Sequence, residues 1–239
     1  MLVSHISCYN QGIMEKPHAL IVGGSSGLGL ALAKKLHGSY QVTITGRQDP
    51  KVDSLHFIPL DITSDIEKLS TDLERVVKAA PTWHLVVYAA GYFQDGRLTE
   101  LDQKEVLTMY SVGLLAPTLL LQQILHKQTK LPELIAITST SQWTPREYEP
   151  IYTATKAGLG MLANSLSLDT AAVDKVLVAG PSGMQTSFWA ADGRDTSAML
   201  DPDWVAAQIL ESTVGEFRYK FIKILREPPR VEEMEVRSE

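Results

Sequence analysis

Short apolar runs alternate with helix-length amphipathic segments along the whole chain, and this alternation is the feature that most constrains its fold. The runs predicted to be strands are Ala19–Val22, Gln41–Thr45, His56–Leu60, Leu85–Ala89, Leu134–Ser139, Val176–Gly180 and Phe221–Leu225. The segments predicted to be helices are about Gly27–Leu36, Asp65–Ala79, Gln103–Leu125, Tyr152–Leu168 and Asp203–Glu211. Apolar strands that alternate with helices predict an α/β fold, a doubly wound parallel sheet of about seven strands with helices on both faces.

A chain of 239 residues is long enough to bury a large core, and a single domain over residues 17–239 is the simplest organisation. We expect residues 1–16 to form a poorly ordered N-terminal extension. The last residues, from Arg226 onward, are mostly charged and include two prolines. This composition predicts a solvated, charged C-terminal tail.

The composition argues against several classes of function. The formal net charge of −6 and the pI near 5.5 show no basic excess of the kind that nucleic acids attract. The single cysteine, Cys8, cannot form an internal disulfide, and the six histidines show no metal-ligand spacing, which favours a reduced cytoplasmic protein without a metal site. The first residues lack the pattern of a signal peptide, and the longest apolar stretch, from Val112, is too short to span a bilayer. We therefore expect neither nucleic acid nor a membrane as a partner.

A glycine-rich turn, "GGSSGLG" from Gly23 to Gly29, follows the first predicted strand. Glycines there let the backbone approach a pyrophosphate, whose charge is held by the amide groups and the positive end of the next helix. Many strand–helix junctions use glycines for packing only, and the spacing G-x-x-x-G-x-G is not the commonest dinucleotide fingerprint. The position between the first strand and the first helix nevertheless favours phosphate binding.

Two residues at the ends of the second and third strands bear on which nucleotide is bound. Arg47 lies where the adenosine ribose of a dinucleotide is expected, and arginine suits a 2′-phosphate whereas an acidic residue suits a free 2′-hydroxyl. Asp61 is placed to accept a hydrogen bond from an adenine amino group, or else to cap the helix that begins near Asp65. An exposed loop charge is the alternative for Arg47.

Tyr152 and Lys156 are four residues apart, which places them on the same face of a helix. A lysine ammonium one turn away favours the phenolate, so the pKa of Tyr152 is expected to fall from about 10 toward the working pH. Ser139 ends the fifth strand, where its hydroxyl can hold the oxygen of a carbonyl or alcohol whose carbon exchanges hydride with a nicotinamide. With the glycine-rich turn, the pair predicts an acid/base for carbonyl reduction or alcohol oxidation.

These motifs resemble those of the short-chain dehydrogenase/reductase family, from about Pro17 to Leu225. The matching stretches are "VGGSSGLG" for T-G-x-x-x-G-x-G, "LDIT" for the aspartate turn, "AAG" at 89–91 for the end of N-N-A-G, Ser139, "YTATK" for Y-x-x-x-K and "PSGMQT" at 181–186 for P-G-x-x-x-T. The resemblance implies a compact Rossmann-like domain that acts on a small carbonyl or alcohol. It also implies a homodimer or homotetramer assembled through the helix from about Gln103 and the helix from Tyr152.

The resemblance further implies the roles of the site residues. Ser139 would orient the substrate, Tyr152 would be the catalytic acid/base, and Lys156 would bind the nicotinamide ribose and tune Tyr152. The implied cofactor-binding residues are Gly23, Ser25, Ser26, Gly27, Leu28, Gly29, Arg47, Asp61, Ile62, Ala89, Ala90, Gly91, Tyr152, Lys156, Pro181, Ser182, Met184 and Thr186. Arg47 matches the position where NADP-preferring members carry a basic residue, so NADP (NADPH) is the expected cofactor and NAD the alternative.

Several positions depart from the family pattern. Val22, Tyr88, Ala89 and Ser182 replace a threonine, two asparagines and a glycine. Tyr110 stands where the family's helix asparagine completes a proton relay; it could exchange a proton through its hydroxyl, but core packing is the interpretation that we favour. The predicted function is an NADP-dependent oxidoreductase. The alternatives are a non-catalytic NADP-binding redox sensor and, less favoured, a sugar-nucleotide epimerase.

Apolar residues that follow strand ends are expected to ring the nicotinamide. They are Tyr92, Phe93, Trp143, Met184, Phe188 and Trp189. Such a wall favours an apolar or aromatic carbonyl compound, although aromatic residues near a site more often belong to the core.

Overall fold

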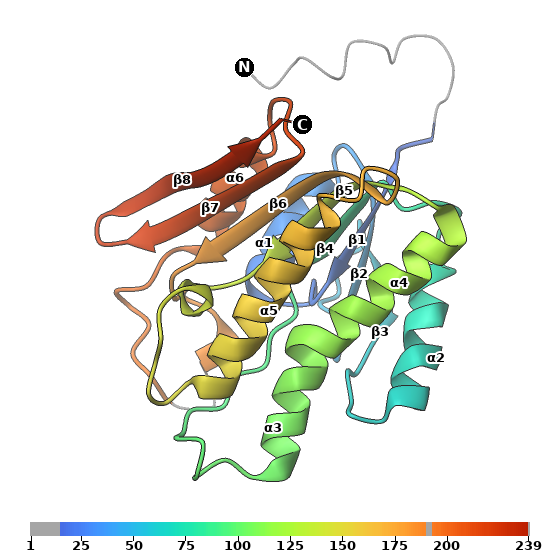
Figure 1. Cartoon of the computed structure of the whole chain (residues 1–239). Helices are drawn as coiled ribbons and strands as arrows, with labels where there is room; N and C mark the ends of the chain where they lie inside the picture. Colours follow the sequence, from blue (N-terminus) through green and yellow to red (C-terminus); the bar gives the residue numbers. More distant parts are fainter. Residues whose placement is uncertain (1–14, 190–192, 239) are drawn as a thin grey trace.

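The computed structural model describes residues 15–189 and 193–238, so almost all of the predicted extension over residues 1–16 lies outside the described residues. Eight strands form one sheet in the order β3-β2-β1-β4-β5-β6-β7-β8 (Figure 1). Strands β1 to β7 run parallel, and β8 is antiparallel to β7. The predicted α/β fold is confirmed, with one strand more than expected.

The predicted elements agree with the observed ones to within a few residues, apart from the two corrections described below. The strands are β1 (His18–Val22), β2 (Gln41–Gly46), β3 (His56–Pro59), β4 (Leu85–Tyr88), β5 (Leu131–Ile137), β6 (Val173–Pro181), β7 (Tyr219–Arg226) and β8 (Pro229–Arg237). The helices are α1 (Gly27–Leu36), α2 (Ile66–Val77), α3 (Gln103–Tyr110), α4 (Ala116–Gln128), α5 (Pro150–Leu166) and α6 (Pro202–Ser212). The short helical turns are η1 (Ser111–Leu115), η2 (Thr140–Gln142) and η3 (Ser187–Trp189).

Alternating side chains of the central strands bury apolar surface on both faces of the sheet. Leu20 and Tyr88 point into the layer formed by α2, α4 and α5, whereas Ile21 and Val87 point into the layer formed by α1 and α6. Strands that are buried on both faces read as continuous apolar runs, which is why β1 and β4 could be found from the sequence. The sheet and the helices on its two faces therefore form three layers, and this rigid scaffold holds the loops at the carboxyl ends of the strands in place.

The predicted single helix over residues 103–125 is wrong in its interior, because a π-helical turn, η1, separates α3 from α4. Gly113 in this turn packs so closely on Thr155 of α5 that a Cβ atom would collide with the threonine side chain. A π turn alters the carbonyl pairing of a helix. The carbonyl of Val112 accepts a hydrogen bond of 2.5 Å from the hydroxyl of the fully buried Tyr88. Tyr88 of β4 therefore anchors the turn.

The segment from Gln103 to Gln128 is also long and apolar enough to cross a bilayer by length and composition. Half of its most apolar window is buried inside the protein. The core helix of a globular fold has the same properties, and here α4 covers the sheet beside α2 and α5 (Figure 1).

The predicted solvated tail from Arg226 is also wrong, because most of it forms strand β8, which pairs along the whole length of β7. Lys220 of β7 forms an ion pair of 3.1 Å with Glu233 of β8. Arg237 of β8 donates hydrogen bonds to the side chains of Asn164 and Ser167 at the end of α5. The partner strand and these contacts order a segment that its charged composition alone would leave in solvent.

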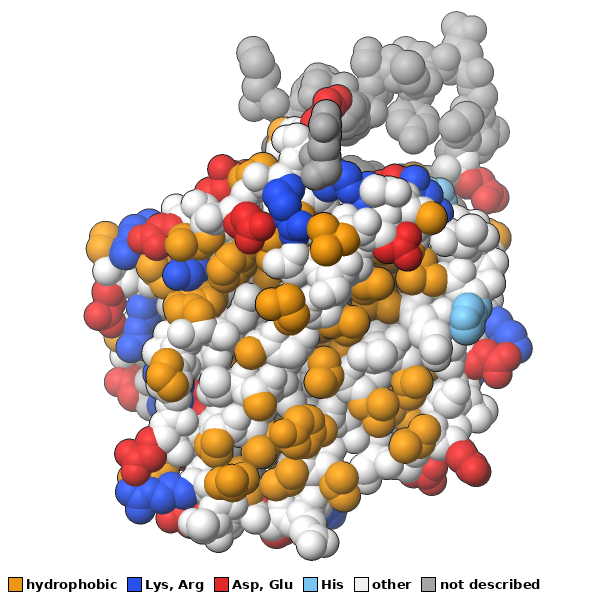
Figure 2. All heavy atoms as spheres, viewed as in Figure 1, with side chains coloured by type: hydrophobic (Ala, Val, Ile, Leu, Met, Phe, Trp, Pro, Cys, Tyr) orange, Lys and Arg blue, Asp and Glu red, His pale blue; other side chains and the backbone are white. Residues whose placement is uncertain are grey.

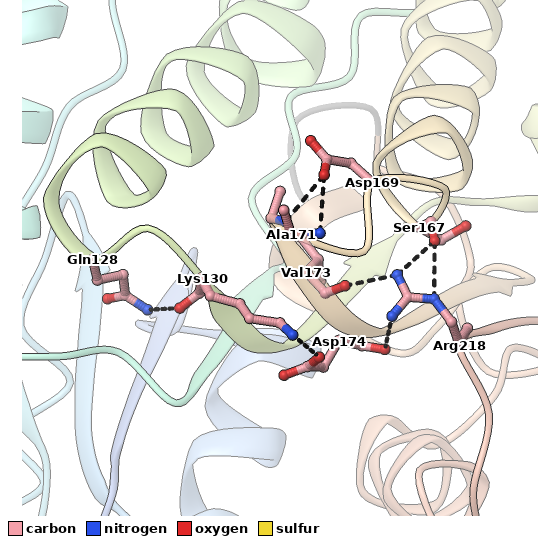
Figure 3. A network of polar contacts seen from close by, with 9 residues as sticks. Gln128, Lys130, Ser167, Asp169, Ala171, Val173, Asp174 and Arg218 are labelled. Atoms are coloured by element: carbon pink, nitrogen blue, oxygen red, sulfur yellow. Dashed lines mark hydrogen bonds and ion pairs between the residues drawn. The ribbon is translucent and has the colours of Figure 1, made fainter. Parts of the chain in front are cut away.

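A polar network joins the end of α5 to the first residues of β6 (Figure 3), so it lies at the amino ends of the strands, away from the cavity. The guanidinium of Arg218 donates hydrogen bonds of 2.8 Å to the carbonyl of Ser167 and 2.9 Å to that of Val173. It also donates one of 3.3 Å to the carbonyl of Asp174, whose carboxylate pairs with Lys130 at 2.6 Å. The network fixes the far end of the helix that carries Tyr152.

Candidate active site

A cavity of about 750 Å³ opens at the carboxyl ends of the parallel strands. It spans the point where the strand order reverses, between β1 and β4, which is where doubly wound sheets bind ligands. All of the residues predicted to be catalytic or to bind cofactor line this cavity. Segments far apart in the sequence are thus brought to one place.

The glycine-rich turn between β1 and α1 forms the floor of one half of the cavity. Gly23 has a φ of +80°, and a Cβ atom there would collide with the backbone of Ala90. A Cβ atom on Gly29 would collide with the carbonyl of Gly23. These two positions therefore require glycine, and the close backbone approach leaves room for a ligand directly above the turn.

The N-terminus of α1 differs from that of three other helices. Asp65, Asp102 and Asp201 cap α2, α3 and α6 by accepting hydrogen bonds from first-turn amide groups. The N-cap of α1, Ser26, makes no such side-chain bond, and the first turn of α1 has no acidic residue. The free amide groups and the positive end of the helix dipole are therefore available to an anion, so this half of the cavity fits the pyrophosphate of a dinucleotide.

The two residues predicted to contact the adenosine half lie on the cavity wall. Asp61 is not the cap of α2, because Asp65 fills that position by accepting a 3.0 Å hydrogen bond from the amide of Lys68. Arg47 lines the cavity just after β2. Asp49 lies near Arg47 in the sequence, but its carboxylate contacts the amide and the ammonium of Lys51 at 2.8 and 3.0 Å.

Tyr152, in the first turn of α5, is only 8% exposed and lies in an aromatic cluster. Its ring is 5.3 Å from that of Phe93 and 6.2 Å from that of Phe188. The expected fall in the pKa of Tyr152 is wrong: burial raises this pKa, and a hydrogen bond with Ser139 opposes the rise only in part. The phenol is therefore protonated at neutral pH and can act as a proton donor.

Lys156 lies one turn further along α5, and its side chain is buried. Its Nζ atom donates a hydrogen bond of 3.1 Å to the carbonyl of Ile137. Burial lowers the pKa of Lys156 to about 8, so the ammonium is charged at neutral pH but close to its titration point. A cation held this way, next to a phenol, can stabilise the phenolate that forms when Tyr152 gives up its proton.

Ser139 follows β5 and begins the short turn η2. Its Oγ atom accepts a hydrogen bond of 3.2 Å from the amide of Ser141. The same side chain forms a hydrogen bond with that of Tyr152, and both residues line the cavity. The two hydroxyl groups therefore lie together in the cavity wall, where both can contact a ligand oxygen.

Two expectations about nearby residues do not hold. Tyr110 is 40% exposed and does not line the cavity, so it is neither packed in the core nor within the site. Trp143 packs behind the wall, with its ring 5.6 Å from that of Phe221 and close against Gly180. The other five residues of the predicted apolar ring do line the cavity.

Sequence reasoning missed four polar residues on the substrate side of Tyr152. Thr140 and Ser141 come from η2, and Arg146 and Glu149 come from the loop that leads into α5. All four belong to the short segment between Ser139 and Tyr152. Because both ends of that segment are site residues, its position in the chain was the signal that could have found them.

Comparisons with known proteins agree with this geometry. A family model described as short chain dehydrogenase matches residues 17–196. An uncharacterized oxidoreductase of Staphylococcus aureus (strain MW2) is 27% identical over 216 residues, covering 80% of this chain and 88% of the relative.

Two solved structures share the fold. One is a short-chain dehydrogenase from Sphingobium yanoikuyae in complex with NADPH, with a TM-score of 0.72, 19% identity and coverage of 82% of this chain and 84% of that one. The other is an alcohol dehydrogenase from the archaeon Thermococcus sibiricus complexed with 5-hydroxy-NADP, with a TM-score of 0.73, 22% identity and coverage of 87% and 96%.

The chain belongs to the short-chain dehydrogenases, and it is an oxidoreductase of that family.

Proposed function

We propose that the protein is an NADP-dependent oxidoreductase that interconverts a carbonyl compound and an alcohol, with Tyr152 as the acid/base. The observation that carries this proposal is the meeting of Ser139, Tyr152 and Lys156 in the same cavity as the uncapped N-terminus of α1. The first group suits proton transfer to a carbonyl oxygen, and the second suits a dinucleotide pyrophosphate. When bound, the nicotinamide supplies or takes up the hydride.

The roles of the three residues follow from their surroundings. Ser139 donates a hydrogen bond to the substrate oxygen and holds it near the Tyr152 hydroxyl. In the direction of reduction, Tyr152 gives its proton to that oxygen, because burial keeps the phenol protonated until a base is offered. Lys156 stabilises the resulting phenolate and binds the ribose hydroxyls. The aromatic side chains exclude water around the reacting centre.

The preference for NADP rests on Arg47. Its side chain is on the cavity wall, and the nearest carboxylate in the sequence, Asp49, is engaged by Lys51. An arginine whose nearest carboxylate in the sequence is engaged elsewhere favours a 2′-phosphate over a free 2′-hydroxyl. The fold neighbour from Sphingobium yanoikuyae, which is described with NADPH, is consistent with this choice.

We also propose that two copies associate through α3, η1 and α5, in a cytoplasmic protein. Leu107 is 53% exposed and Met161 is 63% exposed on this face. Leu114 of η1 connects the two, because it packs against Gly158 of α5. Figure 2, which views the molecule from the side of these helices, shows hydrophobic side chains spread over the surface. Such a surface is typical of an interface between subunits.

A panel of carbonyl compounds assayed with NADPH and with NADH tests the proposed function. We expect oxidation of NADPH, followed by its absorbance, with at least one member of the panel. Binding of NADPH without turnover of any member would instead favour a redox sensor. No binding of either nucleotide would contradict the proposed use of the cavity.

A further inference from the structure

The wall of the cavity beyond Tyr152 is polar on one side, and the chemistry proposed above gives no role to the groups that form it. These groups are Thr140, Ser141, Arg146 and Glu149. Glu149 is the N-cap residue of α5 and Tyr152 lies in the first turn of that helix, so the carboxylate and the phenol are at the same end of α5. Arg146 lines the same cavity, so a ligand that fills this part of the cavity lies near both charged groups.

Glu149 is held in place with part of its carboxylate free. Its side chain is only 15% exposed, and its Oε2 atom accepts a hydrogen bond of 2.9 Å from the hydroxyl of the buried Ser141. Arg146 contacts the same oxygen at 3.6 Å, which is too long for a hydrogen bond. Within the part of the chain that the structure describes, both contacts use Oε2, so Oε1 is left for a ligand.

The guanidinium of Arg146 is likewise held by one hydrogen bond and partly accessible to a ligand. Its Nη2 atom donates a hydrogen bond of 3.2 Å to the hydroxyl of Thr140, and 41% of its side chain is exposed. Its loop is tied down on the outside by Arg97, which contacts Glu147 at 2.7 Å and Tyr148 at 3.0 Å. The donor and the acceptor are therefore presented on an anchored loop.

The charges of this pair determine what it can recognise. Arg146 and Glu149 have opposite charges that cancel, so the pair does not select for a ligand of one net charge. It offers a donor next to an acceptor, and a hydroxyl group is the substituent that accepts from a guanidinium and donates to a carboxylate at once. An apolar substituent would make neither of these hydrogen bonds and would take water away from both charged groups.

We propose that Arg146 and Glu149 bind a hydroxyl group that the substrate carries beside its reacting carbonyl carbon. The substrate class is then the hydroxyketones and hydroxyaldehydes, together with the diols that their reduction yields. This inference rests on the proposed function. Addition of a hydride to the carbonyl carbon and of the Tyr152 proton to its oxygen turns a hydroxyketone into a diol, while NADPH is oxidised to NADP.

A matched pair of ketones tests the inference. 2-Hydroxyacetophenone and propiophenone differ only by a hydroxyl group in place of a methyl group. We expect kcat/KM of the wild type to favour the hydroxylated ketone by at least about tenfold, because hydrogen bonds to charged groups supply that discrimination. Arg146→Met and Glu149→Met should each bring the ratio close to one. Glu67→Met makes the same change at an exposed position of α2, outside the cavity and away from this loop, and should keep the ratio.

Direct binding separates failure of the inference from failure of the proposed function. The dissociation constants of 1-phenyl-1,2-ethanediol and 1-phenyl-1-propanol can be measured with cofactor present by quenching of tryptophan fluorescence, because Trp189 lines the cavity. Tighter binding of the diol by about tenfold, lost in both cavity variants, supports the inference even if neither ketone is reduced. Equal binding of the two alcohols, or equal kcat/KM for the two ketones, overturns it while turnover of either ketone leaves the proposed function standing.

Discussion

The Nζ atom of Lys156 lies 5.6 Å from the centre of the Tyr152 ring, on the next turn of α5. Both side chains are buried, and burial changes their acidities in opposite directions: it raises the pKa of the phenol and lowers that of the ammonium. At neutral pH the site therefore holds a neutral acid beside a cation that is close to its titration point. Two predictions depend on this pair.

Tyr152→Phe removes the proton donor and keeps the shape of the side chain. Turnover should fall at least about a hundredfold, because general acid catalysis contributes that much or more. Cofactor affinity, measured by titration, should change little. A variant with near-normal turnover would show that another group supplies the proton.

Lys156 should make stability depend on pH in a defined window. Its pKa is about 8 in the folded protein against 10.5 in the unfolded chain, so between these values the unfolded chain binds more protons. The free energy of unfolding contributed by this group therefore rises as pH increases from about 8 toward 10. Lys156→Met should lack this rise when urea midpoints are compared from about pH 7 to pH 10. Parallel profiles of the two proteins would contradict the lowered pKa.

Arg47→Ala should weaken NADPH binding selectively. A charge-assisted contact with a 2′-phosphate is worth about 1.5 to 3 kcal/mol, which is tenfold or more in the dissociation constant. Affinity for NADH should stay nearly the same, and the preference of the wild type should decline with added salt because the arginine is exposed. Equal affinity of the wild type for NADPH and NADH would contradict the proposed contact of Arg47 with the 2′-phosphate.

Tyr88→Phe should destabilise the fold, because it removes the donor that satisfies the carbonyl of Val112 inside the π turn. An unpaired buried carbonyl costs about 1 to 3 kcal/mol, to be measured as a change in the free energy of unfolding in urea. Tyr110→Phe is the matched control, since that hydroxyl is on a 40% exposed side chain. Equal effects of the two changes would mean that the bond to Val112 is not what stabilises the turn.

Met161→Glu on α5 should shift the proposed dimer toward monomer. A carboxylate at the centre of an apolar interface has to be desolvated on association, which costs several kcal/mol. Light scattering at micromolar concentration would measure the change. Ile66→Glu alters another exposed apolar residue, at the start of α2, and should leave the mass unchanged. A wild type that is already monomeric under these conditions would contradict the proposed association.

The parts of the site that could be predicted are those whose residues are close to one another in the sequence. Gly23 and Gly29 are separated by one strand–helix turn, and Tyr152 and Lys156 by one turn of helix, so their proximity does not depend on the rest of the fold. The acidity of Tyr152 does depend on it. Phe93 and other distant residues bury the phenol, and no pattern around the tyrosine reports that burial.

The C-terminal strand shows the same limit for the fold. Residues 229–237 lack the apolar alternation by which strands are found, because neither face of β8 is deeply buried. Its pairing with β7 and the contacts of Arg237 with α5 are long-range and leave no signal in the segment itself. The prediction of one continuous helix over Gln103–Leu125 fails for a related reason, since Tyr88, the partner of its π turn, comes from strand β4.

Strand β8 also covers the edge of β7, along which strands of other molecules could otherwise pair. Without it, the backbone of β7, whose Ile222 is buried, would present unpaired amide and carbonyl groups to any other strand. The exposed edge instead belongs to β8, where Pro229 lacks an amide donor and the many charged side chains of the strand discourage the addition of another strand. A shortened chain that ended at Arg226 would keep every proposed catalytic residue, but the edge of β7 would be unpaired. We therefore expect that removal of β8 would promote aggregation by pairing between strands of different molecules.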